Sequence, residues 1–249
     1  EGSSRKMHFE NPVAGAKVIK MKLKFVLNEP AILINKTLVI GDIHIGYEYE
    51  LESYGIHIPN QTERIIKKIE KIIKETKAKK LILLGDIKHF FKGISFNEFK
   101  DLPNFLDKLS EKIELIIVKG NHDGNIEDLV ENIKVYDASG FRDNNIYYFH
   151  GNGKPKEDYK KCKIILMSHV HPLIKFSSGN SVMYERCWII SENKNSKLII
   201  LPAFNDLLGG VSINSEKIEL INGFKFEESK IYLLDGTYIG KIKEIKNKN

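Results

Sequence analysis

Short apolar runs that each end at a glycine and a polar residue are the feature that most constrains how this chain folds. Three of them lie in the first half: residues 37–40 before Gly41-Asp42, residues 81–84 before Gly85-Asp86, and residues 115–118 before Gly120-Asn121. Uninterrupted apolar runs are typical of strands in a parallel sheet that is covered on both faces. We therefore expect the polar residues after these runs to lie together at one edge of the sheet, where open α/β sheets bind ligands.

Helical patterns separate these runs. Residues 61–77 carry isoleucines at the spacing of one helix face, and a second helical pattern surrounds Pro103. Residues 125–133 are predicted to form a short third helix. The alternation of strand and helix predicts a largely parallel central sheet with helices on its faces.

The second half of the chain consists mostly of short apolar runs, several of them separated by turn residues such as Asn222-Gly223 and Asp235-Gly236. The runs are residues 146–149, 163–167, 183–190, 198–201, 211–213, 217–221, 230–234 and 238–242. This pattern predicts strands that form a second sheet. The predicted fold class is α/β, a four-layered α/β/β/α sandwich of two mixed sheets flanked by helices.

The sequence predicts a simple domain organisation. No linker, repeat or low-complexity segment divides the chain, so residues 21–249 are expected to form a single domain. Residues 1–20 show no periodicity. They are interpreted as an N-terminal extension, either native or added for expression, with Met21 as one candidate start.

Charge and cysteine content limit the classes of function. No apolar run approaches the roughly 18–20 residues of a membrane helix, and no signal peptide is visible, so no membrane partner is expected. Two cysteines, Cys162 and Cys187, are too few for a disulfide framework, which fits a cytoplasmic location. The net charge of +6 permits an anionic substrate. The lysines are dispersed and often paired with glutamate, which favours a solvated surface over a nucleic-acid groove.

Histidines continue the series of polar residues into the second half. His150 follows the run at 146–149, and Ser168-His169-Val170-His171 follows the run at 163–167. In Asp42-Ile43-His44 and in His169-Val170-His171, strand alternation is expected to point both polar side chains the same way. Carboxylate, amide and imidazole ligands without cysteine are unlike a structural zinc site. They are typical of a dinuclear hydrolytic centre, in which two ions about 3.5–4 Å apart act on one phosphorus.

Taken in order, the motifs are Asp42-x-His44, Gly85-Asp86, Gly120-Asn121-His122-Asp123, His150 and His169-x-His171. This ordered set, which spans residues 42–171, resembles the calcineurin-like metallophosphoesterase superfamily. The resemblance implies the metallophosphoesterase fold and metal-dependent hydrolysis of phosphate esters. One departure is visible, because the family usually has glycine where this chain has Ser168. We expect Ser168 to be extended, with its hydroxyl tolerated or helping to orient an imidazole.

The resemblance also implies a role for each residue. One metal ion would be bound by Asp42, His44, Asp86 and His171, and the other by Asp86, Asn121, His150 and His169. Asp86 would then bridge the ions together with a water or hydroxide, and that hydroxide would attack phosphorus. His122 would contact the substrate and protonate the leaving oxygen, with Asp123 orienting its ring. Alternatively, Asp123 caps the helix that follows it.

His89 points to one branch of the superfamily. It lies three residues after Asp86, as in the DNA-repair nucleases that include the SbcD exonuclease. The segment Leu201-Pro202-Ala203-Phe204-Asn205 resembles small SbcD-related phosphoesterases of archaea and bacteria. The resemblance makes His89 a candidate catalytic residue, and the candidate substrate contacts are His89, Asn121, His122 and Asn205. Little chain remains after His171 for an added DNA-binding domain, and no heptad pattern appears in it. This argues against a full repair nuclease.

Three functions stay open after the sequence alone. A compact phosphoesterase, most of all a phosphodiesterase, is favoured over a nuclease that cleaves DNA or RNA. The third is a catalytically inactive metal-binding interaction module, against which the intact His122-Asp123 pair argues. Two divalent ions are expected, with Mn²⁺ first and Fe, Zn, Co or Ni also compatible with the ligands. A homodimer is expected because two-fold dimers are the commonest soluble assembly.

Overall fold

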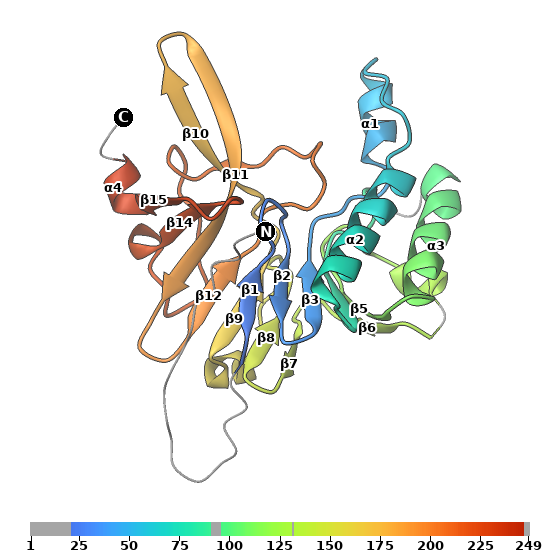
Figure 1. Ribbon diagram of the computed structural model, residues 1–249, viewed down its shortest axis with the longest axis horizontal. Coiled ribbons are helices and arrows are strands. Elements are labelled where there is room, and N and C mark those ends of the chain that lie inside the picture. Colours follow the sequence, from blue (N-terminus) through green and yellow to red (C-terminus); the bar gives the residue numbers. More distant parts are fainter. Residues whose placement is uncertain (1–20, 91–95, 131, 247–249) are drawn as a thin grey trace.

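The computed structural model describes residues 21–90, 96–130 and 132–246 of the 249-residue chain. The expected N-terminal extension, residues 1–20, lies outside this part. Two sheets pack against each other, and a buried apolar cluster that includes Ile82 and Leu84 of one sheet and Leu166 and Trp188 of the other lies between them (Figure 1). The fold class is therefore the predicted one, a mixed α/β architecture with two mixed sheets.

The first sheet contains the three runs from which the sequence argument began. Its strands are β1 (Leu23–Phe25), β2 (Ile32–Ile34), β3 (Thr37–Ile40), β4 (Lys80–Leu84), β5 (Glu114–Val118) and β6 (Lys134–Tyr136), in that spatial order. From β3 to β6 the neighbours are parallel. The carboxyl ends of β3, β4 and β5 therefore meet at one edge, as predicted. The antiparallel strands β1 and β2 were not predicted.

Two helices cover the outer face of this sheet, α2 (Thr62–Thr76) and α3 (Phe96–Ser110) (Figure 1). The predicted isoleucine face of α2 is buried and packs in one cluster with Leu81 and Leu83 of β4. Because side chains alternate along a strand, the neighbouring Ile82 and Leu84 face the second sheet instead. This alternation explains why residues 81–84 of β4 are all apolar.

The predicted third helix over residues 125–133 is wrong. The segment forms one 3-10 turn, η1 (Ile126–Leu129), and the chain has entered β6 by Lys134. Asn125, just before the turn, has a left-handed backbone with φ of 59°. Since β5 and β6 are neighbours in the sheet, this short connection completes the crossover without a longer helix.

The second sheet has the order β13-β10-β11-β12-β9-β8-β7, with β14 beside β11 and β15 beside β14. Its strands are β7 (Phe141–Asp143), β8 (Ile146–Tyr148), β9 (Ile164–Met167), β10 (Pro172–Ser178), β11 (Ser181–Glu192), β12 (Lys197–Ile200), β13 (Val211–Ser212), β14 (Lys230–Leu233) and β15 (Tyr238–Lys241). The predicted strand at 217–221 does not form. Ile218 and Leu220 are partly buried against the outer core without a strand partner.

The outermost layer, on the second sheet, is thin. It is built from η2 (Glu157–Lys161), η3 (Phe226–Glu228) and α4 (Ile242–Lys246), which bury Tyr159, Phe226 and Ile242 in the core on that face. Within the described ranges, no helix is both long and apolar enough to cross a membrane.

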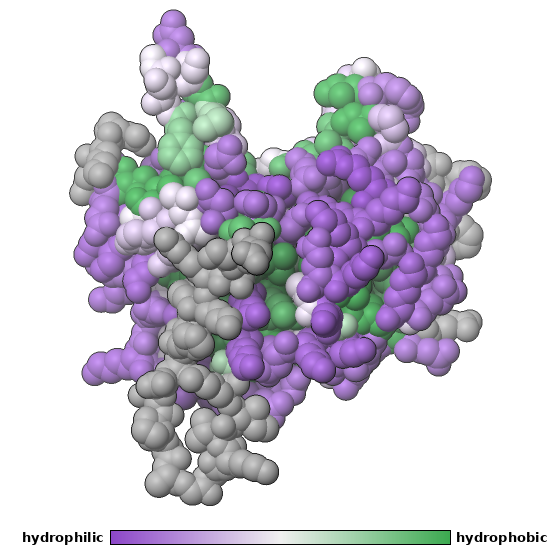
Figure 2. All heavy atoms as spheres, viewed as in Figure 1, coloured by the Kyte–Doolittle hydropathy of each residue, from purple (hydrophilic) through white to green (hydrophobic). Residues whose placement is uncertain are grey.

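Two elements project beyond the sandwich, and both begin next to a predicted metal motif. Helix α1 (Tyr47–Ser53) starts three residues after His44, and the β10–β11 hairpin starts directly after His171. The rings of His44 and His171 are only 5.6 Å apart, between centroids. The two projections diverge from there and stand on either side of a hollow (Figures 1 and 2).

Candidate metal centre

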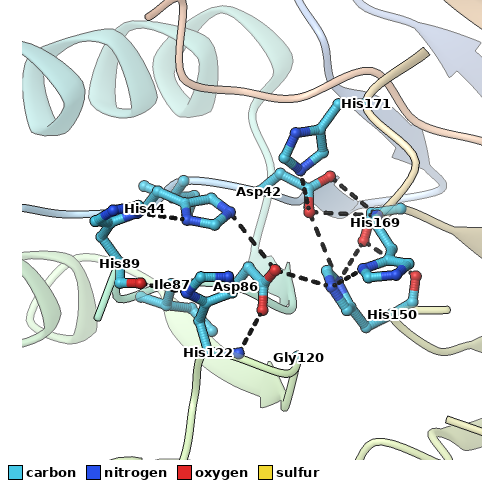
Figure 3. A network of polar contacts seen from close by, with 12 residues as sticks. Asp42, His44, Asp86, Ile87, His89, Gly120, His122, His150, His169 and His171 are labelled. Atoms are coloured by element: carbon cyan, nitrogen blue, oxygen red, sulfur yellow. Dashed lines mark hydrogen bonds and ion pairs between the residues drawn. The ribbon is translucent and has the colours of Figure 1, made fainter. Parts of the chain in front are cut away.

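Five loops at the strand ends bring the predicted ligands together (Figure 3). Three groups of side chains offer ligand atoms that lie within 4.8 Å of one another: Asp42 with His44 and His171, Asp86 with His150 and His169, and His44 with His89 and His122. The first two groups correspond to the two predicted ligand sets, with two differences. Asn121 is absent from the second group, and Asp86, which was predicted in both sets, is in the second group only. Residues from both sheets contribute, so the packing of one sheet on the other assembles the site.

Backbone conformation, rather than strand alternation, aims these side chains. Five of the ligand residues have positive φ: Asp42 (56°), His44 (47°), Asp86 (50°), His169 (71°) and His171 (47°). This left-handed region is uncommon for residues other than glycine and costs of order 1–3 kcal/mol each. The predicted period-two alternation is therefore wrong, because β3 and β9 end before the two motifs begin. Strained backbone of this kind is concentrated at functional sites.

Asp86 lies between the two groups. Its Oδ2 is 3.5 Å from His44 Nε2 and 3.2 Å from His150 Nε2, while its Oδ1 accepts a 2.9 Å hydrogen bond from the backbone N–H of His122. Burial opposes ionisation of Asp86, but His150 and His44 beside it bring its pKa well below the usual range. One carboxylate thus contacts an imidazole from each group, as a bridging ligand must.

His150 is fully buried, and contacts at its Nδ1 fix the orientation of its ring. Its Nδ1 lies 3.0 Å from the carbonyl oxygen of Leu84 and 2.9 Å from Ser168 Oγ, so that Nε2 points at Asp86. The Ser168 hydroxyl also donates to the Leu84 carbonyl, and Ser168 has no positive φ. Burial lowers the pKa of His150, but Asp86 and Asp42 more than offset this and raise it to about 9. Ser168 is therefore accommodated in the way expected from the sequence.

Asp42 contacts both histidines of the loop His169-Val170-His171. Its Oδ1 lies 3.1 Å from His171 Nε2, and its Oδ2 accepts a 3.1 Å hydrogen bond from the backbone N–H of His169. On its other side, His171 Nδ1 faces the carbonyl oxygen of Gly209 at 3.2 Å. A carbonyl at Nδ1 fixes the proton there and leaves Nε2 with a lone pair, the arrangement typical of a metal-binding imidazole.

Three of the atoms that would bind metal lack a hydrogen-bond partner. Among the described residues, six buried side-chain nitrogen or oxygen atoms have no hydrogen-bond partner, and three belong to predicted ligands: His44 Nε2, His171 Nε2 and Asn121 Oδ1. The separations of 3.1–3.5 Å between facing ligand atoms suit groups that each lie about 2.0–2.2 Å from a shared ion. The donor set therefore fits divalent metal ions.

Two glycines make this close approach possible. A Cβ added to Gly85 would lie 2.2 Å from His150 Nδ1, and one added to Gly120 would lie 2.1 Å from Asp86 Oδ1. Real side chains cannot come so close. The glycines in these two motifs are therefore required by the ligands that pack against them.

Asp123 does not have the predicted contact with His122. Its Oδ1 accepts hydrogen bonds from the backbone N–H groups of Ile87 and Lys88, and its Oδ2 accepts one from Gly120. The His122 Nδ1 faces the carbonyl oxygen of His89 instead. Nor does Asp123 cap a helix, since the residue preceding η1 is Asn125. Burial raises the pKa of Asp123 to about 6. Its carboxylate joins the loops after β4 and β5.

Asn205 was predicted to contact substrate, but its amide is bound to the backbone. Its Nδ2 donates to the carbonyl oxygen of Ile43 at 2.9 Å, and its Oδ1 accepts from the N–H of Leu207 at 3.0 Å. Asn205 is 3% exposed. It therefore supports the loop that carries Asp42 and His44 rather than facing an open surface.

The ring of His89 lies behind His44. Its Nδ1 is 3.1 Å from His44 Nδ1, and its Nε2 contacts the carboxylate of Glu50 on α1. Sequence reasoning missed Glu50, because nothing in the local pattern of α1 connects it to a residue 39 positions later. Both ring nitrogens of His89 thus face protein side chains.

Comparisons with known proteins agree with this geometry. The model of the calcineurin-like phosphoesterase family matches residues 36–201, a range that contains every predicted metal ligand. No curated protein matches the chain significantly in sequence.

Solved structures are also similar to this chain, and the first of them shares its fold. The crystal structure of Pseudomonas putida nuclease MPE is 21% identical, with a TM-score of 0.61, and the match covers 93% of this chain and 98% of that chain. Yfce, a phosphoesterase from E. coli, is 12% identical with a TM-score of 0.41, over 82% of this chain and 97% of that one. The family match over residues 36–201, with its ligands gathered at one edge, shows that the chain belongs to the calcineurin-like phosphoesterase family.

Proposed function

We propose that this protein is a metal-dependent phosphodiesterase whose two metal ions share Asp86. The observation that supports this most is the position of the Asp86 carboxylate, within 3.5 Å of one imidazole from each ligand group. In this proposal Asp42, His44, Asp86 and His171 hold the first ion, and Asp86, Asn121, His150 and His169 hold the second. Two divalent ions bound there would neutralise phosphate oxygens and activate water.

His122 is the proposed proton donor. Its Nδ1 is directed at the His89 carbonyl, so a neutral ring carries its proton there, and in the imidazolium the second proton is on Nε2. The His122 ring lies 4.7 Å from the His44 ring, between centroids, which places it beside the metal ligands. The Nε2 proton would pass to the leaving oxygen of the ester as the P–O bond breaks. General acid catalysis of this kind contributes typically 10²–10⁴-fold.

A nuclease is the second candidate. The sequence argument against it was the short chain after His171, but the P. putida nuclease is matched over 98% of its length by 93% of this chain. The likeness is one of fold at 21% identity. It answers the objection from length, because almost the whole of that solved chain corresponds to this one. The pI of about 9.0 is also compatible with a nucleic-acid substrate.

The test is a panel of substrates supplied with Mn²⁺ or Ni²⁺. It contains p-nitrophenyl phosphate, bis-p-nitrophenyl phosphate, cyclic nucleotides, and labelled single- and double-stranded DNA. We expect the diester to be cleaved faster than the monoester. Cleavage of DNA at a comparable rate would select the nuclease. Binding of two metal ions without turnover of any substrate would contradict an enzymatic function and favour the interaction module.

His122→Ala separates proton donation from metal binding. We expect it to slow cleavage of poor leaving groups such as nucleoside alcohols by about 10²–10⁴-fold, with a smaller loss for p-nitrophenol, which leaves readily without a proton. Metal content should not change. The matched control is His57→Ala, since His57 is exposed and pairs only loosely, at 3.4 Å, with Glu52. Equal losses for both leaving groups would contradict the assigned role.

Four narrower expectations remain proposals. These are Mn²⁺ as the native ion, a homodimer, a cytoplasmic location and a single domain over residues 21–249. Metal analysis of protein purified without added ions addresses the first, and sedimentation of the purified protein addresses the second.

A further inference from the structure

Helix α1 contacts the metal centre through one face. Tyr47 and Glu50 lie three residues apart on this helix and therefore share a face. Both contact His89: the Tyr47 and His89 rings are 4.9 Å apart between centroids, and the Glu50 carboxylate contacts His89 Nε2. The carboxylate of an otherwise peripheral helix thus touches a residue of the site.

The position of α1 is fixed by other side chains. The carboxylate of Glu48, which is 2% exposed, accepts a 2.9 Å hydrogen bond from the backbone N–H of Gln61. The Tyr49 hydroxyl donates to the Asp101 carboxylate at 2.6 Å. These contacts attach the helix to α2 and α3, so Glu50 does not rely on its bond to His89 to stay in place.

Glu50 is the start of a chain of contacts that ends at the predicted first metal site (Figure 3 shows its inner part). His89 Nε2 contacts Glu50, His89 Nδ1 lies 3.1 Å from His44 Nδ1, and His44 Nε2 lies 3.5 Å from Asp86 Oδ2. His44 is 4% exposed, and its Nε2 is one of the buried atoms without a hydrogen-bond partner.

The direction of the hydrogen bonds in this chain follows from Glu50. An ionised carboxylate only accepts, so His89 Nε2 must carry the proton. A neutral His89 then has a lone pair on Nδ1, and His44 must donate from its own Nδ1. A neutral His44 with its proton on Nδ1 has a lone pair on Nε2, which is the form that binds a metal ion.

We propose that Glu50 is a positioning residue for the first metal ion, because it selects the tautomer in which His44 Nε2 is a ligand. The inference rests on the proposed function only in taking His44 as a metal ligand. It also gives His89 a different role from the substrate contact inferred from the sequence. The His89 ring transmits the preference of Glu50 to His44, and the His89 backbone carbonyl faces His122.

The test compares Glu50→Ala, Glu50→Gln and the control Glu52→Ala. Glu52 is on the same helix, is exposed, and contacts His57 at 3.4 Å. Binding of Mn²⁺ to metal-free protein is measured by calorimetry. We expect Glu50→Ala to weaken one of the two binding events by about 10–100-fold, the usual effect of removing the partner of a ligating histidine. Glu50→Gln should recover part of this loss, because its amide oxygen can accept the same N–H. Glu52→Ala should bind as the parent protein does.

A spectroscopic readout separates tautomer selection from general damage. With histidines labelled by ¹⁵N in the metal-free protein, the His44 ring should show its proton on Nδ1 in the parent protein and a loss of this preference in Glu50→Ala. Unchanged Mn²⁺ binding and an unchanged His44 signal in Glu50→Ala would overturn the inference. So would equal losses in Glu50→Gln and Glu50→Ala, since the acceptor would then not matter. A parent protein that binds two ions but hydrolyses no ester would contradict the proposed function and leave this result intact.

Discussion

The two loops Asp42-Ile43-His44 and His169-Val170-His171 share a plan but differ in their surroundings. Each follows a buried strand, holds both polar residues at positive φ, and precedes a projecting element. In the first loop, Asp42 is 0% and His44 4% exposed. In the second, His169 is exposed, and the side chain of His171 is 17% exposed. One loop is thus part of the core and the other lies at its surface.

The loops also differ in what holds their backbone. In the first, the N–H groups of Asp42, Ile43 and His44 donate to the carbonyls of Gly85 and Asp86 at 2.9–3.0 Å. In the second, the N–H of His169 donates to the side chain of Asp42, and that of Val170 donates to Ser168 within the same loop. The second loop is therefore held in part by a side chain of the first, while backbone hydrogen bonds from Ser168 N–H to His150 and from Val211 N–H to His171 hold its two ends. We infer that the first loop takes its conformation when the metal-free protein folds, whereas the second loop takes its final conformation when metal ions bind.

The largest expected effect is a difference in the free energy of unfolding between the variants Asp42→Ala and His169→Ala. Removing Asp42 takes away the carboxylate partner of His171 and leaves buried His150 with Asp86 alone of its two carboxylate partners. Losing one partner of a buried charged pair costs roughly 3–5 kcal/mol. His169→Ala should stay within about 0.5 kcal/mol, as exposed substitutions usually do. Both variants should bind less Mn²⁺. Urea unfolding of the metal-free proteins measures the contrast, and equal losses of stability would show that the loops are equivalent.

The grouping of the candidate ligands was predictable from the sequence because each of them follows an apolar run within a few residues. The apolar pattern identified β3, β4, β5 and β9. Parallel pairing brings the ends of β3, β4 and β5 to one edge, and the packing of the second sheet on the first adds the end of β9. The left-handed conformation of Asp42 was not predictable in the same way. Alternation is a property of strands, and the motif starts after β3 has ended at Ile40.

Contacts between distant segments account for the other differences. Asp123 and Asn205 are polar residues within or near motifs, so they were interpreted as functional, yet both bind backbone groups of neighbouring loops. Residues 217–221 have an alternating apolar pattern, yet their apolar side chains pack on the core without forming a strand. Partners of this kind depend on tertiary structure, which no local pattern encodes.

A smaller effect on stability is expected from replacing two asparagines, one that supports the first loop and one that supports β10, the strand after the second loop. Asn205 holds the Ile43 carbonyl of the first loop, and Asn214 holds both backbone groups of Lys175 in β10, at 2.9 and 3.0 Å. Each Asn→Ala change leaves buried polar groups unpaired and should cost about 1–3 kcal/mol. Only Asn205→Ala should also lower Mn²⁺ affinity, by roughly 10-fold. If Asn214→Ala lowers the Mn²⁺ affinity equally, the β10–β11 hairpin after the second loop is as important to the metal centre as the first loop is.

The smallest expected effect concerns the contact between the two loops themselves. A Cβ added to Gly41 would lie 2.8 Å from the Cβ of Ser168 and 3.0 Å from the carbonyl oxygen of Leu84. Gly41→Ala should therefore destabilise the protein. Ser168→Gly removes one of the two obstacles, but it also loses the hydroxyl that contacts His150 Nδ1 at 2.9 Å, at a cost of about 1 kcal/mol. The double variant should be more stable than the sum of the two changes predicts, by about 0.5–2 kcal/mol. Urea unfolding of the four proteins measures this coupling. Strict additivity would mean that the Leu84 carbonyl alone limits the approach, and that the second loop can move away from the first at no cost.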